Sequence, residues 1–205
     1  MKITEVSAQK NNPRRVNVYL DGEYVLSLDD VDAVVLGIKA GREISEDELR
    51  NLLFESQFGK AKAKALDILS SKNISTKALT DELTKKGYDK AVVTQAVDEL
   101  KELGYLNDYD YAVMFLEVCR EKLWGIKKAR YELKQRGIDD FTLEDALCEV
   151  TLCGAQEIAE AIGTKYAHED VADIKTKQKI MRYFSTRGFD FSDIEKAISI
   201  YCKKD

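Results

Sequence analysis

One segment, centred on a glycine, recurs three times along this chain of 205 residues. Gly87, Gly137 and Gly188 lie 50 and 51 residues apart, and a basic residue precedes each of them. Apolar residues recur at matching distances on both sides: Leu79, Ala129 and Ile180 before the glycines, and Ala96, Ala146 and Ala197 after them. A period near fifty residues indicates one supersecondary unit that is used three times.

Within each unit the pattern is helix, break, helix, glycine, helix. A helix ends at low cost in the left-handed conformation when the last residue is glycine, so the three glycines predict where the chain turns back. The sequence therefore predicts a mainly α fold with three tandem three-helix repeats in an elongated, curved array. The expected repeats span residues 60–106, 107–152 and 153–205.

Two finer expectations concern the second and third repeats. Gly125 is expected to break the second repeat after a first helix over residues 109–123, because glycine weakens a helix interior. The middle helix of the third repeat is expected over residues 177–186, before Gly188.

Residues 1–59 are expected to form a small head with an antiparallel β-hairpin. Asp21-Gly22 separates two β-prone runs at 16–20 and 23–28, which is the strongest short hairpin signal. Residues 2–9 are expected to add a third strand. Ser45 and Glu48 then form a capping box that opens a helix continuing past Gly59.

The composition is typical of a soluble, helix-rich protein: 34% of residues are charged, 44% are hydrophobic and one is proline. No apolar run approaches the length of a membrane span, and the N-terminus does not resemble a signal peptide. We therefore expect a cytoplasmic protein without a membrane partner. The cysteines have no CxxC spacing and are expected to be buried free thiols: Cys119, Cys148, Cys153 and Cys202.

Patterns typical of catalysis are missing from the sequence. The single histidine, His168, lies among charged residues and has no metal-ligand spacing around it. There is no phosphate-binding loop, dinucleotide fingerprint or nucleophile elbow. Adjacent carboxylates such as Asp139-Asp140 stand at expected helix starts, where the helix dipole explains them. The sequence predicts no enzyme activity, no catalytic or metal-binding residue and no cofactor.

Basic residues gather on the helices before the second and third glycines, although the net charge is −5. These candidates for contact with nucleic acid are Lys127, Lys128, Arg130, Lys134, Arg136, Lys175, Lys177, Lys179 and Arg182. Lys127, Arg130 and Lys134 share one helix face. Any one of these residues is explained by an ordinary solvent-exposed helix face. Because basic residues gather at the same place in two repeats, a shared positively charged lining of the two repeats stays open as an alternative. Contact through such a lining would be salt-sensitive and directed at phosphates.

The helices after the glycines are acidic, which argues against a helix-turn-helix reading with these as recognition helices. Their carboxylates include Asp98, Glu99, Glu102, Glu144, Asp145, Glu149, Asp193 and Glu195. A recognition helix should not repel phosphates.

A tyrosine-rich segment joins the first and second repeats: Gly104, Tyr105, Leu106, Asn107 and Asp108, followed by Tyr111 and Ala112. Its aromatic residues could stack on bases or anchor a partner, but packing between helices is the favoured interpretation. The segment resembles the signature of the RecX regulatory proteins. The flanking runs at 83–88 with Gly87 and 132–138 with Gly137 resemble that family's first two repeats, and the region around Gly188 is the loosest match.

The resemblance implies a non-enzymatic modulator of the RecA recombinase. RecX-like proteins lodge in the groove of the RecA–single-stranded DNA filament and mainly inhibit recombinase and coprotease activity, and so act in DNA repair, homologous recombination and the SOS response. The implied partners are the RecA filament and, through it, single-stranded DNA, bound by a monomer. Two alternatives stay open: a nucleic-acid-binding regulator that acts without RecA, and a helical interaction scaffold.

Overall fold

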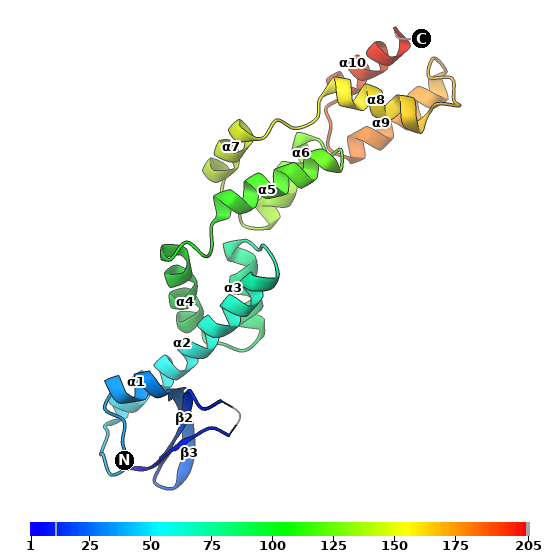
Figure 1. The fold of residues 1–205 in the computed structure, drawn as a ribbon. Coiled ribbons are helices and arrows are strands. Elements are labelled where there is room, and N and C mark those ends of the chain that lie inside the picture. Colours follow the sequence, from blue (N-terminus) through cyan, green and yellow to red (C-terminus); the bar gives the residue numbers. More distant parts are fainter. Residues whose placement is uncertain (11, 204–205) are drawn as a thin grey trace. The chain divides into compact units, whose positions relative to one another are not determined.

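The computed structural model describes residues 1–10 and 12–203. The chain divides into two compact units (Figure 1). The first unit comprises Met1–Ile74 and Ala78–Leu106, and the second comprises Ser75–Lys77 and the chain from Asn107 onward. None of the helices in the described ranges has the length and hydropathy needed to cross a membrane.

The head is a three-stranded antiparallel sheet in the order β1 (Ile3–Ala8), β2 (Arg15–Leu20), β3 (Glu23–Asp29). At the turn between β2 and β3, Asp21 and Gly22 have φ values of 50° and 91°, as a type I′ turn requires. Apolar residues on one face of the sheet pack beneath α1 (Asp30–Val35) and the start of the next helix: Val18, Leu20, Leu26 and Leu28. The predicted hairpin and third strand are confirmed.

The long helix α2 (Glu46–Ser71) connects the head to the first repeat. It begins with the predicted capping box, in which Ser45 Oγ accepts from Glu48 N at 3.2 Å and Glu48 Oε2 accepts from Ser45 N at 2.8 Å. Its first half packs on the sheet, where Ser56 Oγ donates to Ser27 O at 2.6 Å. Because α2 runs unbroken through Gly59, the expected boundary between residues 59 and 60 falls inside one helix.

The first repeat is built from the end of α2 with α3 (Thr76–Lys85) and α4 (Lys90–Glu102). Its core is fully apolar, with Leu79, Leu83, Val93 and Leu100 at most 1% exposed. Gly87, between α3 and α4, has a φ of +88°. The helix therefore ends where the sequence predicts.

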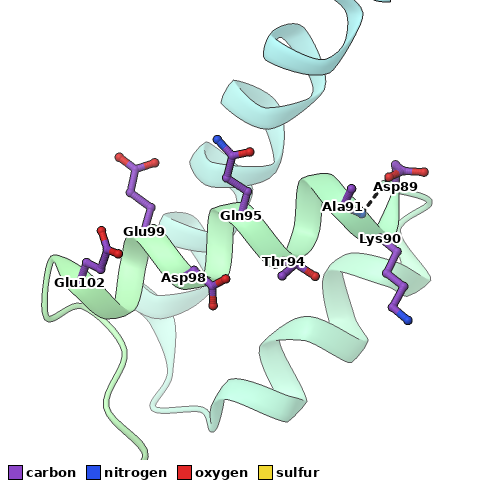
Figure 2. A pocket seen from close by; sticks show the side chains of 8 residues that line it. All are labelled: Asp89, Lys90, Ala91, Thr94, Gln95, Asp98, Glu99 and Glu102. Carbon is purple, nitrogen blue, oxygen red and sulfur yellow. Dashed lines mark hydrogen bonds between the residues drawn. The ribbon is translucent and has the colours of Figure 1, made fainter. Parts of the chain in front are cut away.

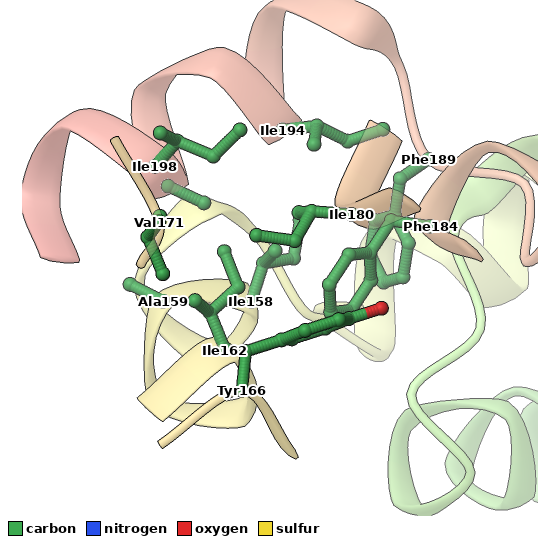
Figure 3. Close-up of a cluster of buried hydrophobic side chains, with 11 residues drawn as sticks. Ile158, Ala159, Ile162, Tyr166, Val171, Ile180, Phe184, Phe189, Ile194 and Ile198 are labelled. Carbon is green, nitrogen blue, oxygen red and sulfur yellow. The ribbon is translucent and has the colours of Figure 1, made fainter. Parts of the chain in front are cut away.

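The second unit holds the other two repeats. The second repeat comprises α5 (Asp108–Glu121), α6 (Ile126–Gln135) and α7 (Asp140–Glu149). The third comprises α8 (Ala155–Lys165), α9 (Ile174–Thr186) and α10 (Phe191–Cys202). Figure 3 shows side chains from all three helices of the third repeat converging on one core, among them Ile158, Ile162, Ile180, Phe184, Ile194 and Ile198.

Two helix boundaries differ from the expectation. α9 begins three residues early, at Ile174, because Asp173 Oδ2 accepts from the backbone N–H groups of Lys175 and Thr176 and caps the helix there. α5 ends at Glu121, and the residue in the left-handed conformation is Leu123, with a φ of +53°, not Gly125. Gly125 has an ordinary φ of −79° and is the residue before α6.

The expectation that the four cysteines are buried is wrong for two of them. Cys119 is buried in the core of the second repeat and Cys153 is half-buried, whereas Cys148 and Cys202 are exposed. Cys148 lies near the end of α7, and Cys202 is the last residue of α10. An apolar-looking helical stretch does not by itself say which side chain faces the core, and this is why sequence alone misplaced them.

Candidate functional site

Three of the four basic residues of α6 are neutralised by neighbouring carboxylates. Ion pairs join Lys127 to Asp190, Arg130 to Glu144, and Lys134 Nζ to Asp140 Oδ1 at 2.7 Å. Two of these acids lie on α7, the helix that follows the glycine. The basic helix and the acidic helix of the second repeat are therefore complementary to each other. The charges of Lys127, Arg130 and Lys134 are therefore paired within the protein.

The ion pair between Arg130 and Glu144 has two contacts, one of them between Nη2 and Oε2 at 3.0 Å. The hydrogen bond from Arg130 lowers the pKa of the Glu144 carboxyl below its usual range. Pairs as exposed as these add little to the stability of a fold, because solvent screens them. Their larger effect is to reduce the positive potential that α6 presents to a polyanion.

Arg136, which follows α6, is also engaged. Its Nη1 lies 2.5 Å from Glu132 Oε2, and its guanidinium lies 4.5 Å from the ring centroid of Phe115. Among the predicted basic residues of this repeat, only Lys128 has no ion pair in the described part of the chain.

The basic residues of α9 have a different environment. Lys179 Nζ pairs with Glu169 Oε2 at 2.8 Å, whereas Lys175, Lys177 and Arg182 are exposed and have no ion pair with any described residue. A groove of about 590 Å³ runs along this helix. It is lined by Tyr166, Lys175, Gln178, Lys179, Arg182, Tyr183 and Thr186. This groove combines free cations with aromatic rings, a combination typical of nucleic-acid contacts.

The helix after the first glycine presents the opposite charge. Figure 2 shows the side chains along α4 that line a groove of about 840 Å³: Asp89, Lys90, Ala91, Thr94, Gln95, Asp98, Glu99 and Glu102. Glu99 pairs with Lys62 of α2 at 2.5 Å, and Asp98 and Glu102 are exposed. An acidic face of this kind repels phosphates and supports the argument against α4 as a recognition helix.

The tyrosine-rich segment is mainly structural. Gly104 ends α4 with a φ of +74°, and Leu106 is 4% exposed in the core of the first repeat. Asn107 caps α5, with its Oδ1 accepting from Tyr109 N at 2.9 Å, and Asp108 is the first residue of that helix.

After the cap, Ala112 is fully buried in the second repeat, and Tyr111 stacks on Phe115 with ring centroids 6.3 Å apart. Among the tyrosines of this segment, Tyr105 is the exposed one, with 61% of its surface accessible.

Sequence reasoning missed three further cations. Lys122, Lys165 and Arg187 lie over the rings of Trp124 or Tyr183 and have no ion pair within the described ranges. Two of these cations stood out in the sequence: Lys122 lies within a run of charged residues, and Arg187 directly precedes Gly188. The contacts with the rings were not visible, because they depend on how the folded chain places the side chains: Trp124 lies in the connection between α5 and α6, and Tyr183 lies on α9.

The described residues give little support for metal binding or for chemistry at a histidine or a buried thiol. No group of three or more His, Cys, Asp or Glu side chains in residues 1–10 and 12–203 is placed to hold a metal ion. His168 is exposed. Burial raises the pKa of the Cys119 thiol to about 11, which keeps it protonated and unreactive at neutral pH.

Comparison with known proteins finds family matches to four segments of the chain. Residues 1–45 match the model of the regulatory protein RecX N-terminal domain. Residues 61–100, 107–147 and 155–198 match the first, second and third three-helix domains of RecX. The matched segments follow the head and the three repeats of the fold.

Curated relatives and solved structures agree. A regulatory protein RecX of Bacillus licheniformis is 33% identical over 199 residues, covering 96% of this chain and 76% of the relative. A regulatory protein RecX of Caldanaerobacter subterraneus subsp. tengcongensis is 30% identical over 205 residues, and the match covers 98% of this chain and all of the relative. A crystal structure of regulatory protein RecX matches the fold with a TM-score of 0.73, at 24% identity, over 97% of this chain and 98% of that one. The chain therefore belongs to the RecX family of regulatory proteins.

Proposed function

We propose that this protein binds the RecA–single-stranded DNA filament and modulates, mainly inhibits, the recombinase and coprotease activities of RecA. The match of the head and all three repeats to RecX domains carries this proposal. The protein would act as a monomer, without catalysis of its own, in the cytoplasm. Its place would be in DNA repair, homologous recombination and the SOS response.

The charge distribution supports a partner made of both protein and DNA. The free cations of the α9 groove suit a phosphate backbone, while the acidic face of α4 suits only protein. With a net charge of −5, overall attraction to DNA is absent. Binding to DNA would therefore depend on local surfaces and on the filament that presents it.

The direct test is to titrate the full-length protein into RecA reactions. The rate of DNA-dependent ATP hydrolysis and the yield of strand exchange should both fall as the protein approaches the concentration of RecA. Cleavage of a coprotease substrate should fall in parallel. If none of these changes at stoichiometric or higher ratios, the proposal is wrong.

A residue-level test compares the two basic helices. Changing Lys175, Lys177 and Arg182 to glutamine should weaken inhibition, because these side chains have no competing ion pair among the described residues. The matched change of Lys127, Arg130 and Lys134 should have a smaller effect, because carboxylates already neutralise them. Circular dichroism should show the same helicity for both variants.

The α9 groove also keeps one alternative open, a regulator that binds nucleic acid without RecA. Such a protein would bind DNA alone tightly, with a steep dependence of affinity on salt concentration. Weak binding to DNA alone together with strong inhibition of RecA would exclude it.

A further inference from the structure

The second and third repeats meet through their backbones. Gly125 N donates to Arg187 O at 2.8 Å, and Lys127 N donates to Gly188 O at 3.1 Å. A Cβ added to Gly125 would lie 2.5 Å from Phe189 N, and one added to Gly188 would lie 2.5 Å from Lys128 Cβ. Neither position has room for a side chain, so the two repeats approach closely at these glycines.

Two aromatic rings flank this joint, and each has two cations over it. Lys128 Nζ lies 4.0 Å from the ring centroid of Trp124, and Lys122 Nζ lies 5.6 Å from it. The ring of Tyr183 has Lys165 at 4.5 Å and Arg187 at 4.6 Å. We call Lys122, Lys128, Lys165 and Arg187 the joint cations.

A hydrogen bond connects the two ring clusters across the joint. Arg187 Nη1 donates to the carbonyl oxygen of Lys122 at 2.6 Å. The joint cations thus form a row along the joint, from Lys165 of α8 and Arg187 after α9 to Lys122 after α5 and Lys128 of α6. All of them belong to the second unit.

The joint cations differ from the neighbouring α6 cations in what holds them. Carboxylates neutralise Lys127, Arg130 and Lys134, but none of the joint cations has an ion pair with a described residue. An aromatic ring attracts a cation and restricts its motion without cancelling its charge. The row thus stays positive and is partly ordered before any ligand binds.

We propose that the joint cations bind the phosphate backbone of single-stranded DNA, with the half-buried rings of Trp124 and Tyr183 available beside the bases. This inference rests on the proposed function and names the part of the protein that would contact DNA in the filament. Non-specific single-strand sites combine a positive surface with aromatic rings in this way. The α9 groove shares Tyr183 with this row and extends the same surface.

Trp124 is the single tryptophan of the chain and reports binding directly. Oligo(dT) titrated into the full-length protein at low salt should change the tryptophan emission in a saturable way. The affinity should fall as salt rises, because binding releases counterions.

The test variant changes Lys122, Lys128 and Lys165 to glutamine and leaves Arg187 intact, because its side chain also bonds to backbone. Each lost phosphate contact lowers the salt slope by about 0.7 for a single strand, so the slope should fall by about 2 and the affinity about tenfold or more. A second variant with only Lys122→Gln and Lys165→Gln keeps Lys128 on the ring and should show about two thirds of that decrease in slope.

The matched control changes Lys127, Arg130 and Lys134 to glutamine, which removes the same charge. It should weaken oligo(dT) binding far less. Three outcomes would overturn the proposal: no saturable binding to the unchanged protein, normal binding by both test variants, or an equal loss in the control.

Inhibition of RecA is measured separately on the same proteins. Intact inhibition without oligo(dT) binding would refute the joint site but not the proposed function. Oligo(dT) binding through the joint without any effect on RecA would refute the function but not the joint site.

Discussion

The helices α6 and α9 stand at the same place in successive repeats, and both are basic and followed by a left-handed glycine. Their surfaces nevertheless differ. On α6 and at Arg136 directly after it, four of the five candidate cations are in ion pairs. On α9, only Lys179 is paired among the residues that the structure describes.

Aligning Gly137 with Gly188 explains the difference. Met181 stands at the position of Arg130, and Ser185 stands at the position of Lys134. The third repeat therefore has no cation at the two positions from which the second repeat forms ion pairs with the carboxylates of α7. The comparison teaches that a basic run in a sequence is not yet a basic surface, because the carboxylates that fold beside it decide how much charge remains.

The largest expected effect concerns the glycines. Gly87 and Gly188 both have a φ of +88°, but an added Cβ meets nothing within 4 Å at Gly87 and meets Lys128 at Gly188. Gly87→Ala should lower the free energy of unfolding by about 1–2 kcal/mol, the cost of the left-handed conformation. Gly188→Ala should cost at least about 3 kcal/mol, since overlap with backbone adds to that strain. Urea unfolding followed by circular dichroism measures both.

Gly125→Ala separates the strain of the left-handed conformation from the steric overlap with a neighbouring repeat. Gly125 has an ordinary φ, so an added methyl group would only overlap with Gly188. It should also destabilise the second unit. Equal losses for Gly87→Ala and Gly188→Ala, or a harmless Gly125→Ala, would show that the joint relaxes easily.

A second contrast between the two repeats lies in their thiols. Cys119 is buried in the second repeat with a pKa raised to about 11 by burial, whereas Cys202 of the third repeat is exposed. At neutral pH, alkylation should be many-fold slower at Cys119 than at Cys202, because burial raises the pKa of the Cys119 thiol to about 11 and shields it from the reagent. Peptide mapping after timed alkylation measures the two rates, and equal rates would show that the core opens readily.

The same thiol makes stability depend on alkaline pH. Below the ordinary pKa of 9.0, Cys119 is protonated in both the folded and unfolded states, so its contribution is constant. Between pH 9.0 and about 11 only the unfolded state loses the proton, and stability should fall as pH rises. Cys119→Ala should reduce this dependence while leaving the exposed cysteines unchanged.

Removing the acidic partners should make α6 resemble α9. The double change Asp140→Asn and Glu144→Gln frees Lys134 and Arg130, and the affinity for oligo(dT) should rise several-fold at low salt. The control, Asp145→Asn with Glu195→Gln, changes the net charge equally but breaks no ion pair of the described residues. A similar gain in both would mean that net charge, not pairing, sets the affinity.

The smallest expected effect is the acid dependence of the pair between Arg130 and Glu144. Because Arg130 lowers the pKa of Glu144 in the folded state, the pair stabilises the fold above the ordinary pKa of 4.5 and is lost as pH falls through the folded value. Glu144→Gln should lower the melting temperature by about 1 °C at neutral pH, since the pair is exposed. The difference should vanish in strong acid, and a persistent difference would point to packing instead.

The local features of the fold were predictable because each depends on neighbouring residues. The Asp21-Gly22 turn, the Ser45 cap and the left-handed glycines all follow from the conformations that single residues favour. The role of Gly125 was not predictable, because the atoms it must accommodate belong to Gly188 and Phe189, far away in sequence. The same holds for the pairing of Lys127 with Asp190 across two repeats.

The sequence by itself determined the period of the chain, the helices within it and the family to which the chain is similar, since these depend on local conformational preference and on repeated patterns. Only the tertiary structure decided which cations remain free. Charge is neutralised through space, over a few ångströms, and mostly by acids that lie outside the helix that carries the cations. The glycines that first revealed the repeat thus also set, at Gly188, how closely two repeats approach and which cations meet at their joint.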